Sequence, residues 1–572
     1  MRYFVNPLSC VNKVFIRFNY LAKVLVIAVV LTGLAFHDAK AQSVSITSPA
    51  NGSSYNVGDI IPVTATATTT FLGSLDKVVF TLGSVTQTDF SGPYNVSLNT
   101  STLAAGSYTL TVTNYYTPFL GFQNTISATI TITLNGAPVI TYTTPQVYTV
   151  GTPITTLTPA NTGSAAGTFG FGTATALTGA TLNNPRGIAM DALGNIYVTN
   201  SGNNTISKYN SSGTYVSTFG SGATMSFPKD LVFDSSGNAY VLNLGATAGT
   251  GTVYKYNSSG VYQSTILSGL NYALGLTIDA SDNIYVADQG AVTVKKYSTS
   301  GALLLSLPTT NFSTPLGVAV DASGNIYVLN NGTGNVTKYN SAGTFLSTFL
   351  TGYTSAQAIT IDGAGNIYVG DNAVTNTVYV YNQSGTLLTS KAVTDPEGIA
   401  VDTKGTMFTS SYFSNQMNKY TPTGGYYLNK ALPAGLNFNS STGSISGTPT
   451  AAKAATVYTV TAYNTLGSGS ATLSITVNSP ATYSNYAFQD GIMLNTTSLG
   501  ITSNLTNFPA LLSIQDNDLI ISGTCADKVQ NPNGPNYDFA FVSGGSELYY
   551  QVESYNQTTG TLLVWVQIPS LT

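Results

Sequence analysis

Histidine, cysteine and charged side chains are scarce in this chain of 572 residues. It holds one histidine, His37, and two cysteines, Cys10 and Cys525, and only 7% of its residues are Asp, Glu, Lys or Arg. Beyond residue 41 there is therefore no Ser-His-Asp or Cys-His nucleophile pair, no histidine general base and no histidine metal ligand. One remaining cysteine cannot form an internal disulfide. The composition disfavours any enzyme that depends on these residues.

Residues 1–41 have the features of a secretory signal peptide. A basic start is followed by an apolar run over residues 24–36 and by Ala39 and Ala41, which form an A-x-A cleavage pattern. A membrane anchor is the alternative, but a run of 13 residues is shorter than the roughly 20 that a spanning helix needs. No later stretch is long and apolar enough either. We expect export, cleavage, and a secreted or cell-surface protein without a transmembrane span.

Cleavage would leave a weakly acidic protein. It would keep 14 Lys and Arg (19 minus 5) against 22 Asp and Glu (23 minus 1), which gives a net charge of −8. Arg186 would be its one arginine. Because phosphate binding needs clustered Lys and Arg, we expect no nucleic-acid partner.

One phrase recurs six times between residues 168 and 424 and organises the chain. Each copy has a hydrophobic strand, an Asp turn and a second strand, as in GIAMDALGNIYV from Gly187. The turn aspartates are Asp191, Asp234, Asp279, Asp321, Asp362 and Asp402. Successive aspartates are 43, 45, 42, 41 and 40 residues apart. A fixed period of this size indicates an array of supersecondary units.

Each repeat is predicted to hold four antiparallel strands. Ile, Val and Tyr alternate with small residues in strand fashion, and D-x-x-G-N is a tight turn whose Gly and Asn tolerate left-handed backbone. A third strand ends in Lys-Tyr-Asn, as at residues 208–210, and a Ser-Gly turn leads to a fourth. Four antiparallel strands in each period make a propeller blade.

The phrase P-x-G-I-A-x-D-x-x-G-N-I-Y-V resembles the NHL repeat family, and its six copies imply a six-bladed β-propeller over residues 168–424. Residues 168–170 copy residues 218–220 at the end of the first outer strand. We therefore expect this N-terminal strand to complete the sixth blade and close the ring. The similar streptogramin lyases and the peptide-amidating lyase depend on histidines that this chain lacks.

Ig-like β-sandwiches are expected around the propeller. Residues 42–135 alternate strand-like runs with turns, and their opening ITSPANG resembles bacterial Ig-like modules. Residues 136–167 resemble the first strands of the He-PIG Ig family, whose later motifs LPAGLNFN and TGSISGTP lie in residues 425–478. We infer that the propeller is inserted into a loop of this domain, which close guest termini permit. Two unrelated fragments flanking a free-standing propeller are the alternative.

Residues 479–572 are predicted to form a linker and a β-rich domain. The motifs LTNFPALL, YDFAF, LYYQVE and VWVQIP resemble a domain of unknown function that often lies beside concanavalin-like lectin modules in bacterial surface proteins. The chain ends soon after the last motif, so we expect a truncated sequence with a further module beyond it. Cys525 is expected to be a small buried hydrophobe.

The residue after the Pro or Ala that begins each repeat is predicted to lie at the mouth of the central channel. The six are Arg186, Lys229, Leu274, Leu316, Gln357 and Glu397. The four polar members form a candidate ligand-binding ring, in which Arg186 suits a carboxylate or a sugar. The alternative is that Arg186 simply pairs with Glu397, because ring closure makes the first and sixth blades neighbours.

The turn aspartates and repeated tyrosines are expected to be structural. Calcium needs about six to eight oxygens in one place, whereas each repeat supplies one turn carboxylate, so no metal or cofactor is predicted. The tyrosines are Tyr197, Tyr209, Tyr256, Tyr285, Tyr327, Tyr339 and Tyr368. They are candidates for sugar stacking, but at this spacing we expect them to pack between blades.

These observations predict an all-β, exported and non-enzymatic protein for binding or adhesion. The propeller and the Ig-like modules would bind an extracellular protein or glycan, and no catalytic residue is assigned. The alternative is a carboxylate- or metal-dependent lyase or lactonase acting at the propeller mouth.

Overall fold

The computed structural model of this chain is almost entirely β-strand. It describes residues 42–69, 73–118, 121–373, 376–479, 505–515, 541–543, 546–556, 558–559 and 561–571. Within these residues there is one 3-10 turn, Thr309–Asn311 (η1), and no α-helix. The all-β prediction is thereby confirmed. The expected signal peptide and Cys525 lie outside the described residues.

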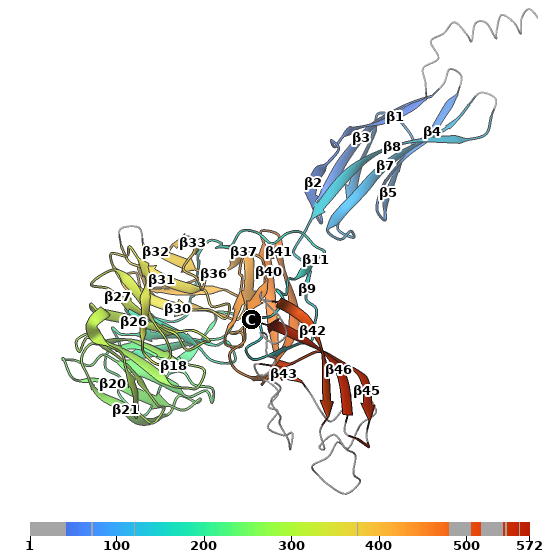
Figure 1. The fold of residues 1–572 in the computed structure, drawn as a ribbon. Coiled ribbons are helices and arrows are strands. Elements are labelled where there is room, and N and C mark those ends of the chain that lie inside the picture. The colour runs from blue at the N-terminus through green and yellow to red at the C-terminus, as the bar shows by residue number, and fades with distance from the viewer. Residues whose placement is uncertain are drawn as a thin grey trace, which may run out of the picture.

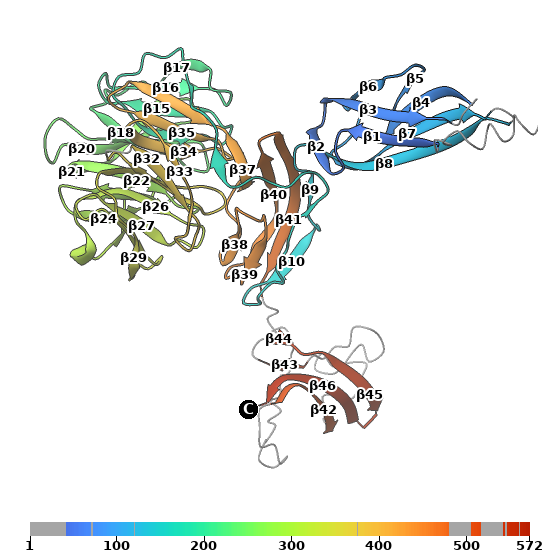
Figure 2. The same ribbon diagram turned by 90° about the horizontal axis from the view of Figure 1, so that it is seen from above.

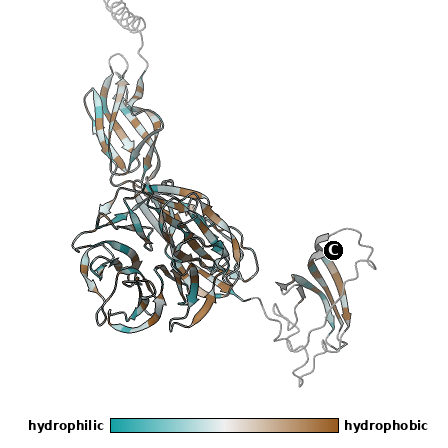
Figure 3. Ribbon diagram, turned by 90° about the vertical axis from the view of Figure 1, so that its left-hand side faces the viewer, coloured by the Kyte–Doolittle hydropathy of each residue, from teal (hydrophilic) through white to brown (hydrophobic). Residues whose placement is uncertain are grey.

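Two β-sheets enclose a common core in the N-terminal part. One contains β1 (Ser43–Ser48), β3 (Ile60–Thr68) and β6 (Tyr94–Asn99). The other contains β2 (Ser53–Asn56), β8 (Asn124–Asn135), β7 (Gly106–Thr117), β4 (Ser74–Leu82) and β5 (Val85–Asp89). Alternate residues of β3, Ile61 and Val63, are buried against Phe80 and Val112 of the second sheet. The alternation of hydrophobic and hydrophilic residues along these strands is visible in Figure 3.

Six four-stranded antiparallel sheets follow, one for each repeat. The inner strands are β14 (Pro185–Met190), β18 (Pro228–Phe233), β22 (Ala273–Ile278), β26 (Pro315–Val320), β30 (Ala356–Ile361) and β34 (Pro396–Val401). The second strands are β15 (Ile196–Asn200), β19 (Ala239–Asn243), β23 (Ile284–Asp288), β27 (Ile326–Asn330), β31 (Ile367–Asp371) and β35 (Met407–Ser411). Each inner strand contacts the inner strands of both neighbouring sheets, including β14 with β34, so the sheets close into a ring (Figures 1 and 2).

The outer half of each sheet consists of two further strands. The third strands are β16 (Thr205–Tyr209), β20 (Gly251–Tyr256), β24 (Thr293–Tyr297), β28 (Asn335–Tyr339), β32 (Thr377–Tyr381) and β36 (Gln416–Tyr420). The outermost strands are β17 (Tyr215–Phe219), β21 (Tyr262–Leu270), β25 (Leu303–Ser306), β29 (Phe345–Thr351), β33 (Leu387–Ala392) and β13 (Thr175–Ala176). The last of these precedes the first repeat in sequence and belongs to the sixth sheet, so both ends of the ring meet there.

The Asp turn between the first two strands is a hydrogen-bonded clamp. In the fourth sheet, Asp321 Oδ1 accepts the backbone N–H groups of Ser323 and Asn325. Its Oδ2 accepts the Asn325 side chain at 2.8 Å and the Tyr327 hydroxyl at 3.1 Å. The same pattern recurs at Asp191, Asp234, Asp279 and Asp362. These carboxylates are occupied by their own turns, as the structural interpretation predicts.

The repeated tyrosines fill the space between neighbouring sheets. Tyr197, Tyr209, Tyr256, Tyr285, Tyr327, Tyr339 and Tyr368 are each at most 1% exposed. Packing between sheets is thereby confirmed, and these rings are not accessible platforms for sugars.

The strand that completes the sixth sheet is shifted from the predicted position. β13 pairs with β36, whereas residues 168–170 were expected there. Gly170–Phe171 (β12) pairs instead with β37 (Pro422–Leu428). The physical reason is aromatic packing, because Phe169 stacks on Tyr427 with 4.8 Å between ring centroids and Phe171 meets the same ring edge-on.

Segments from both sides of the ring share one sheet and one core. The sheet runs β10 (Gln146–Thr149), β41 (Gly467–Asn478), β40 (Lys453–Asn464), β37 and β12. Short hairpins add β9 (Ile140–Thr141) with β11 (Ala160–Asn161) and β38 (Leu436–Phe438) with β39 (Ile445–Gly447). Ile140 and Tyr142 from before the ring pack with Val460 and Ile475 from after it. We call residues 136–167 and 425–478 together the flanking unit.

The flanking unit lies beside the ring (Figure 2) and contacts the turns between the first two strands of the fifth and sixth sheets. The Asn366 side chain donates to Ser440 Oγ at 2.8 Å, and the Tyr463 hydroxyl donates to the Lys404 carbonyl at 3.0 Å. Strand β37 serves both bodies, because Tyr427 packs into the ring while its neighbour Tyr426 packs into the flanking core. The opposite end of the ring, where the inner strands begin, holds the predicted mouth residues.

A small sheet closes the described chain. It consists of β42 (Leu505–Gln515), β46 (Thr561–Leu571) and β45 (Tyr550–Asn556), beside the hairpin of β43 (Val542–Ser543) and β44 (Ser546–Glu547). Leu562, Val564 and Val566 of β46 are buried in its core.

Candidate functional site

The six inner strands line a central channel of about 240 Å³. Each predicted mouth residue is the second residue of its inner strand, so all six lie at the same end of the ring. Five of them line the channel: Lys229, Leu274, Leu316, Gln357 and Glu397. Arg186 lies in an adjoining pocket of about 90 Å³ that shares Lys229 with the channel.

Three of the predicted polar residues form an ion cluster. Glu397 Oε2 accepts Arg186 Nη1 at 3.0 Å and Lys229 Nζ at 3.2 Å. The predicted pairing of Arg186 with Glu397 is thus present, and Lys229 joins it. Gln357 lines the same channel, but its Nε2 donates to Ser355 Oγ at 3.4 Å. The structure therefore brings together two cations and one carboxylate and leaves the amide outside the cluster.

Lys229 is the most deeply placed cation of the cluster, with its side chain 5% exposed. Burial lowers the pKa of Lys229, and the nearby Glu397 carboxylate opposes that shift by favouring the charged form. An ammonium has three donors. Within the described residues its hydrogen-bond partner is Glu397 alone, so two donors remain for a ligand.

Arg186 is held in place from two sides. Its guanidinium lies over the Tyr412 ring, 4.2 Å from the centroid, and its Nε donates to Ser201 Oγ at 3.1 Å. Stacking and the side-chain hydrogen bond fix the plane of the guanidinium. The hydrogen bonds found within the described residues use Nε and Nη1 and leave Nη2 for a ligand.

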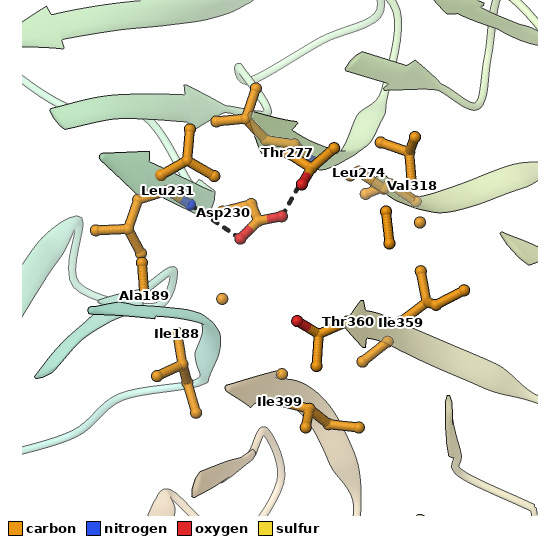
Figure 4. Close-up of a pocket in the computed structure, with 18 of the residues that line it drawn as sticks. Ile188, Ala189, Asp230, Leu231, Leu274, Thr277, Val318, Ile359, Thr360 and Ile399 are labelled. Atoms are coloured by element: carbon orange, nitrogen blue, oxygen red, sulfur yellow. Dashed lines mark hydrogen bonds between the residues drawn. The ribbon is translucent and has the colours of Figure 1, made fainter. Parts of the chain in front are cut away.

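Asp230 is a channel residue that the sequence analysis missed. It occupies the position where four repeats have glycine and one has Ala358. Its Oδ1 accepts the Leu231 N–H at 2.9 Å and its Oδ2 the Leu276 N–H at 3.0 Å (Figure 4). Burial raises the pKa of Asp230 to about 6, against the opposing effect of these two bonds and of Lys229. The departure from the repeat at this position was the signal in the sequence.

Gly187 makes room for this carboxylate. A Cβ at Gly187 would lie 2.4 Å from Asp230 Oδ1 and 2.7 Å from its Cα. The small residue in the first sheet and the acidic one in the second are therefore complementary.

Beyond the charged cluster most of the side chains that line the channel are apolar. Figure 4 shows Ile188, Ile359 and Ile399 around the same space as Asp230 and Thr360. In the part of the chain that the structure describes, no group of three or more His, Cys, Asp or Glu side chains is arranged to hold a metal ion. The arrangement can receive an anionic group at the mouth, and it places two carboxyl groups, those of Asp230 and Glu397, near that position.

Three family profiles match parts of the chain. One described as "Bacterial Ig domain" matches residues 43–112, one described as "NHL repeat" matches residues 182–209, and one described as "Putative Ig domain" matches residues 389–478. The chain thus contains Ig-like and NHL repeat segments. The third match begins within the fifth sheet of the ring and extends through the C-terminal part of the flanking unit. No curated protein matches the chain.

Solved structures match at low identity. A Bacteroides thetaiotaomicron protein of unknown function is 14% identical, covers 67% of this chain and 99% of its own, and has a TM-score of 0.37. Virginiamycin B lyase from Staphylococcus aureus is 15% identical over 49% of this chain and 98% of its own, with a TM-score of 0.35. The WD40 β-propeller domain of Doa1 is 12% identical, covers 44% of this chain and 97% of its own, and has a TM-score of 0.35. At these scores none of them informs the activity of this chain.

Among the described residues, no helix is long and apolar enough to cross a membrane.

Proposed function

We propose that this is an exported, non-enzymatic binding protein with a role in adhesion at the cell surface. In this proposal the ring is a six-bladed NHL-type propeller inserted in an Ig-like domain, and its mouth binds an extracellular protein or glycan. A signal peptide over residues 1–41 and a C-terminal domain of the kind found beside concanavalin-like lectins belong to the same proposal. Family matches to Ig-like and NHL repeat segments support a binding role.

The observation that carries the proposal is the ion cluster at the mouth. Two cations share one carboxylate, and both retain hydrogen-bond donors that no described residue uses. The Lys229 side chain is only 5% exposed. Burying its unused donors without partners is costly, so a ligand that accepts them is favoured.

The test is a glycan and surface-protein array probed with residues 42–572. A matched protein carries Arg186→Ala and Lys229→Ala, and circular dichroism checks that it is folded. We expect selective binding to at least one ligand that the double variant loses. Binding that survives the substitutions would move the site to the Ig-like or C-terminal modules, and no binding to any ligand would contradict the binding role.

A second candidate is a carboxylate-dependent lyase or lactonase at the mouth. It is favoured by Asp230, whose pKa is raised to about 6 by burial, because a carboxyl group that titrates near neutral pH suits general acid or base work. This candidate predicts a divalent-metal-dependent activity on lactones or uronides that Glu397→Gln abolishes. A panel of both substrate classes that the wild-type protein leaves intact would count against it.

A further inference from the structure

The mouth pocket is a small, partly open space of about 90 Å³ that is lined by both cations of the ion cluster. Its lining includes Arg186, Lys229, Phe227 and Tyr412, so it combines two cations with two aromatic rings. Lys229 forms its base, because the side chain is only 5% exposed. Glu397, the partner of both cations, lines the adjoining channel. A protruding group can enter this space, whereas a flat protein surface cannot reach its base.

The charges of the pocket favour a ligand with a single negative charge. Arg186 and Lys229 together exceed the Glu397 carboxylate by one positive charge, and such a surplus in a buried place favours an anion. Nη2 of Arg186 and two donors of Lys229 are the atoms available to hold it. A carboxylate matches both the charge and the planar fork of the guanidinium.

The rim of the pocket offers an exposed aromatic face. Phe227 is 47% exposed, its backbone is left-handed with φ 51°, and its N–H is held by Asn204 Oδ1 at 2.7 Å. Tyr272 occupies the same position in the next repeat. Its backbone is also left-handed, and its side chain is 45% exposed. A flat apolar ring next to a carboxylate receptor suits the C–H face of a pyranose that carries an acid group.

The backbone of the rim disfavours an extended peptide as the occupant. Ser201 N–H donates to the Asn184 carbonyl at 3.2 Å, and Leu244 N–H donates to the Phe227 carbonyl at 3.1 Å. A peptide that binds as an added strand needs unpaired backbone groups at an edge. Here the rim pairs these groups internally and presents side chains, which is the mode that sugar recognition uses.

From these features, and resting on the proposed binding function, we infer that the mouth pocket recognises the carboxylate of a uronic acid sugar. The carboxylate lies between Arg186 and Lys229, and the sugar ring lies against Phe227. Glu397 positions both cations and does not contact the sugar acid.

The test uses the fact that Arg186 is the only arginine beyond residue 41. Phenylglyoxal modifies arginine, so mass spectrometry of wild-type residues 42–572 reports on this one side chain. The probes are short oligosaccharides of glucuronate, galacturonate and mannuronate, each beside its carboxyl-reduced, neutral counterpart. We expect at least one uronate to slow modification of Arg186 by about ten-fold or more, while the neutral counterpart does not. If no uronate protects Arg186, the inference is overturned.

Binding of the protecting uronate by variants then locates the sugar. Calorimetry should show affinity lowered by about ten-fold or more in Arg186→Lys, which keeps the charge and loses the fork, and in Phe227→Ala. Lys404 is an exposed lysine at the opposite end of the ring. Lys404→Met is therefore the matched control and should bind like the wild type. Equal binding by all three would overturn the assignment to this pocket.

The array separates this inference from the proposed function. A protein ligand that needs Arg186, found together with no protection by any uronate, would keep the binding function and replace the sugar by an acidic side chain. If the array shows no binding and no uronate protects Arg186, the proposed function and the inference are both rejected.

Discussion

Asp230 shows how a single departure from a repeat changes the chemistry of the ring. Four repeats place glycine at this position, and the inner strands there pass too close for most side chains, as the contacts around Gly187 show. An aspartate fits because Gly187 leaves space for its carboxylate and two backbone N–H groups bind it. The same burial that positions the carboxyl group makes its ionisation unfavourable.

This residue should make the stability of the ring depend on pH. The pKa of Asp230 rises from 3.8 to about 6 on folding, so the folded state holds the proton more tightly. Its stabilising contribution is therefore complete below about pH 4 and is lost as the pH rises through 6. Asp230→Asn cannot ionise, so its free energy of unfolding relative to wild type should increase by about 2 kcal/mol between pH 4 and pH 7.

Urea denaturation of both proteins at a series of pH values measures this difference. The asparagine loses one backbone hydrogen bond at every pH, which adds a constant offset and leaves the slope unchanged. A difference in unfolding free energy that stays flat across this range would show that Asp230 is ionised normally in the fold.

The chain enters and leaves the ring side by side, where β12 and β37 pair as antiparallel strands. Gly167 N–H binds the Tyr463 carbonyl and Gly425 N–H binds the Gly167 carbonyl, at 2.8 and 2.7 Å. The two backbones approach so closely that a Cβ at Gly424 would lie 2.0 Å from the Thr168 carbonyl oxygen. At Gly170, on the same pair of strands, a Cβ would find its nearest neighbour, Thr423 Oγ1, at 3.6 Å.

Gly424→Ala should therefore be destabilising while Gly170→Ala should not. Moving backbone to admit the new methyl group costs about 1 to 3 kcal/mol, whereas the control methyl makes ordinary contacts and should change the unfolding free energy by less than about 0.5 kcal/mol. Thermal melting and urea denaturation of the two variants provide the comparison. Equal stability of the two variants would mean that the backbones of the entering and leaving strands do not approach this closely at Gly424.

At the scale of the whole molecule, β37 couples the ring to the flanking unit. Tyr427 is buried among ring residues such as Tyr368, while Tyr426 and Leu428 on either side of it are buried in the core of the flanking unit. Loosening one core should loosen the other, because they share a strand. The two N-terminal sheets have their own core and should respond independently.

Hydrogen exchange read by mass spectrometry tests this coupling in the full chain. Val460→Ala removes two methyl groups from a fully buried site in the flanking core, at a cost of about 2 kcal/mol. We expect faster exchange in β37, β40 and β41 and also in β31 and β35 of the ring. Val112→Ala, equally buried in the N-terminal core, should speed exchange only between residues 43 and 135. Unchanged exchange in the ring of the Val460 variant would show that the two bodies unfold separately.

The local features of this protein follow from its amino-acid sequence. Alternation and turn chemistry act over a few residues, so they predicted the all-β class, the turns at aspartates such as Asp321 and the burial of tyrosines such as Tyr327. The repeat also placed Arg186 and Glu397 at one end of the ring as partners, because ring closure follows from six equal units.

Features that depend on contacts between distant segments arise only in the assembled fold. Phe171 pairs with β37 and not with the sixth sheet, because an aromatic ring more than 200 residues away in sequence, Tyr427, supplies the surface that buries it. Lys229 joins the ion pair, and the pKa of Asp230 rises, because neighbouring sheets close over both side chains. Burial and electrostatic environment arise from the assembled ring, and a single repeat does not contain them.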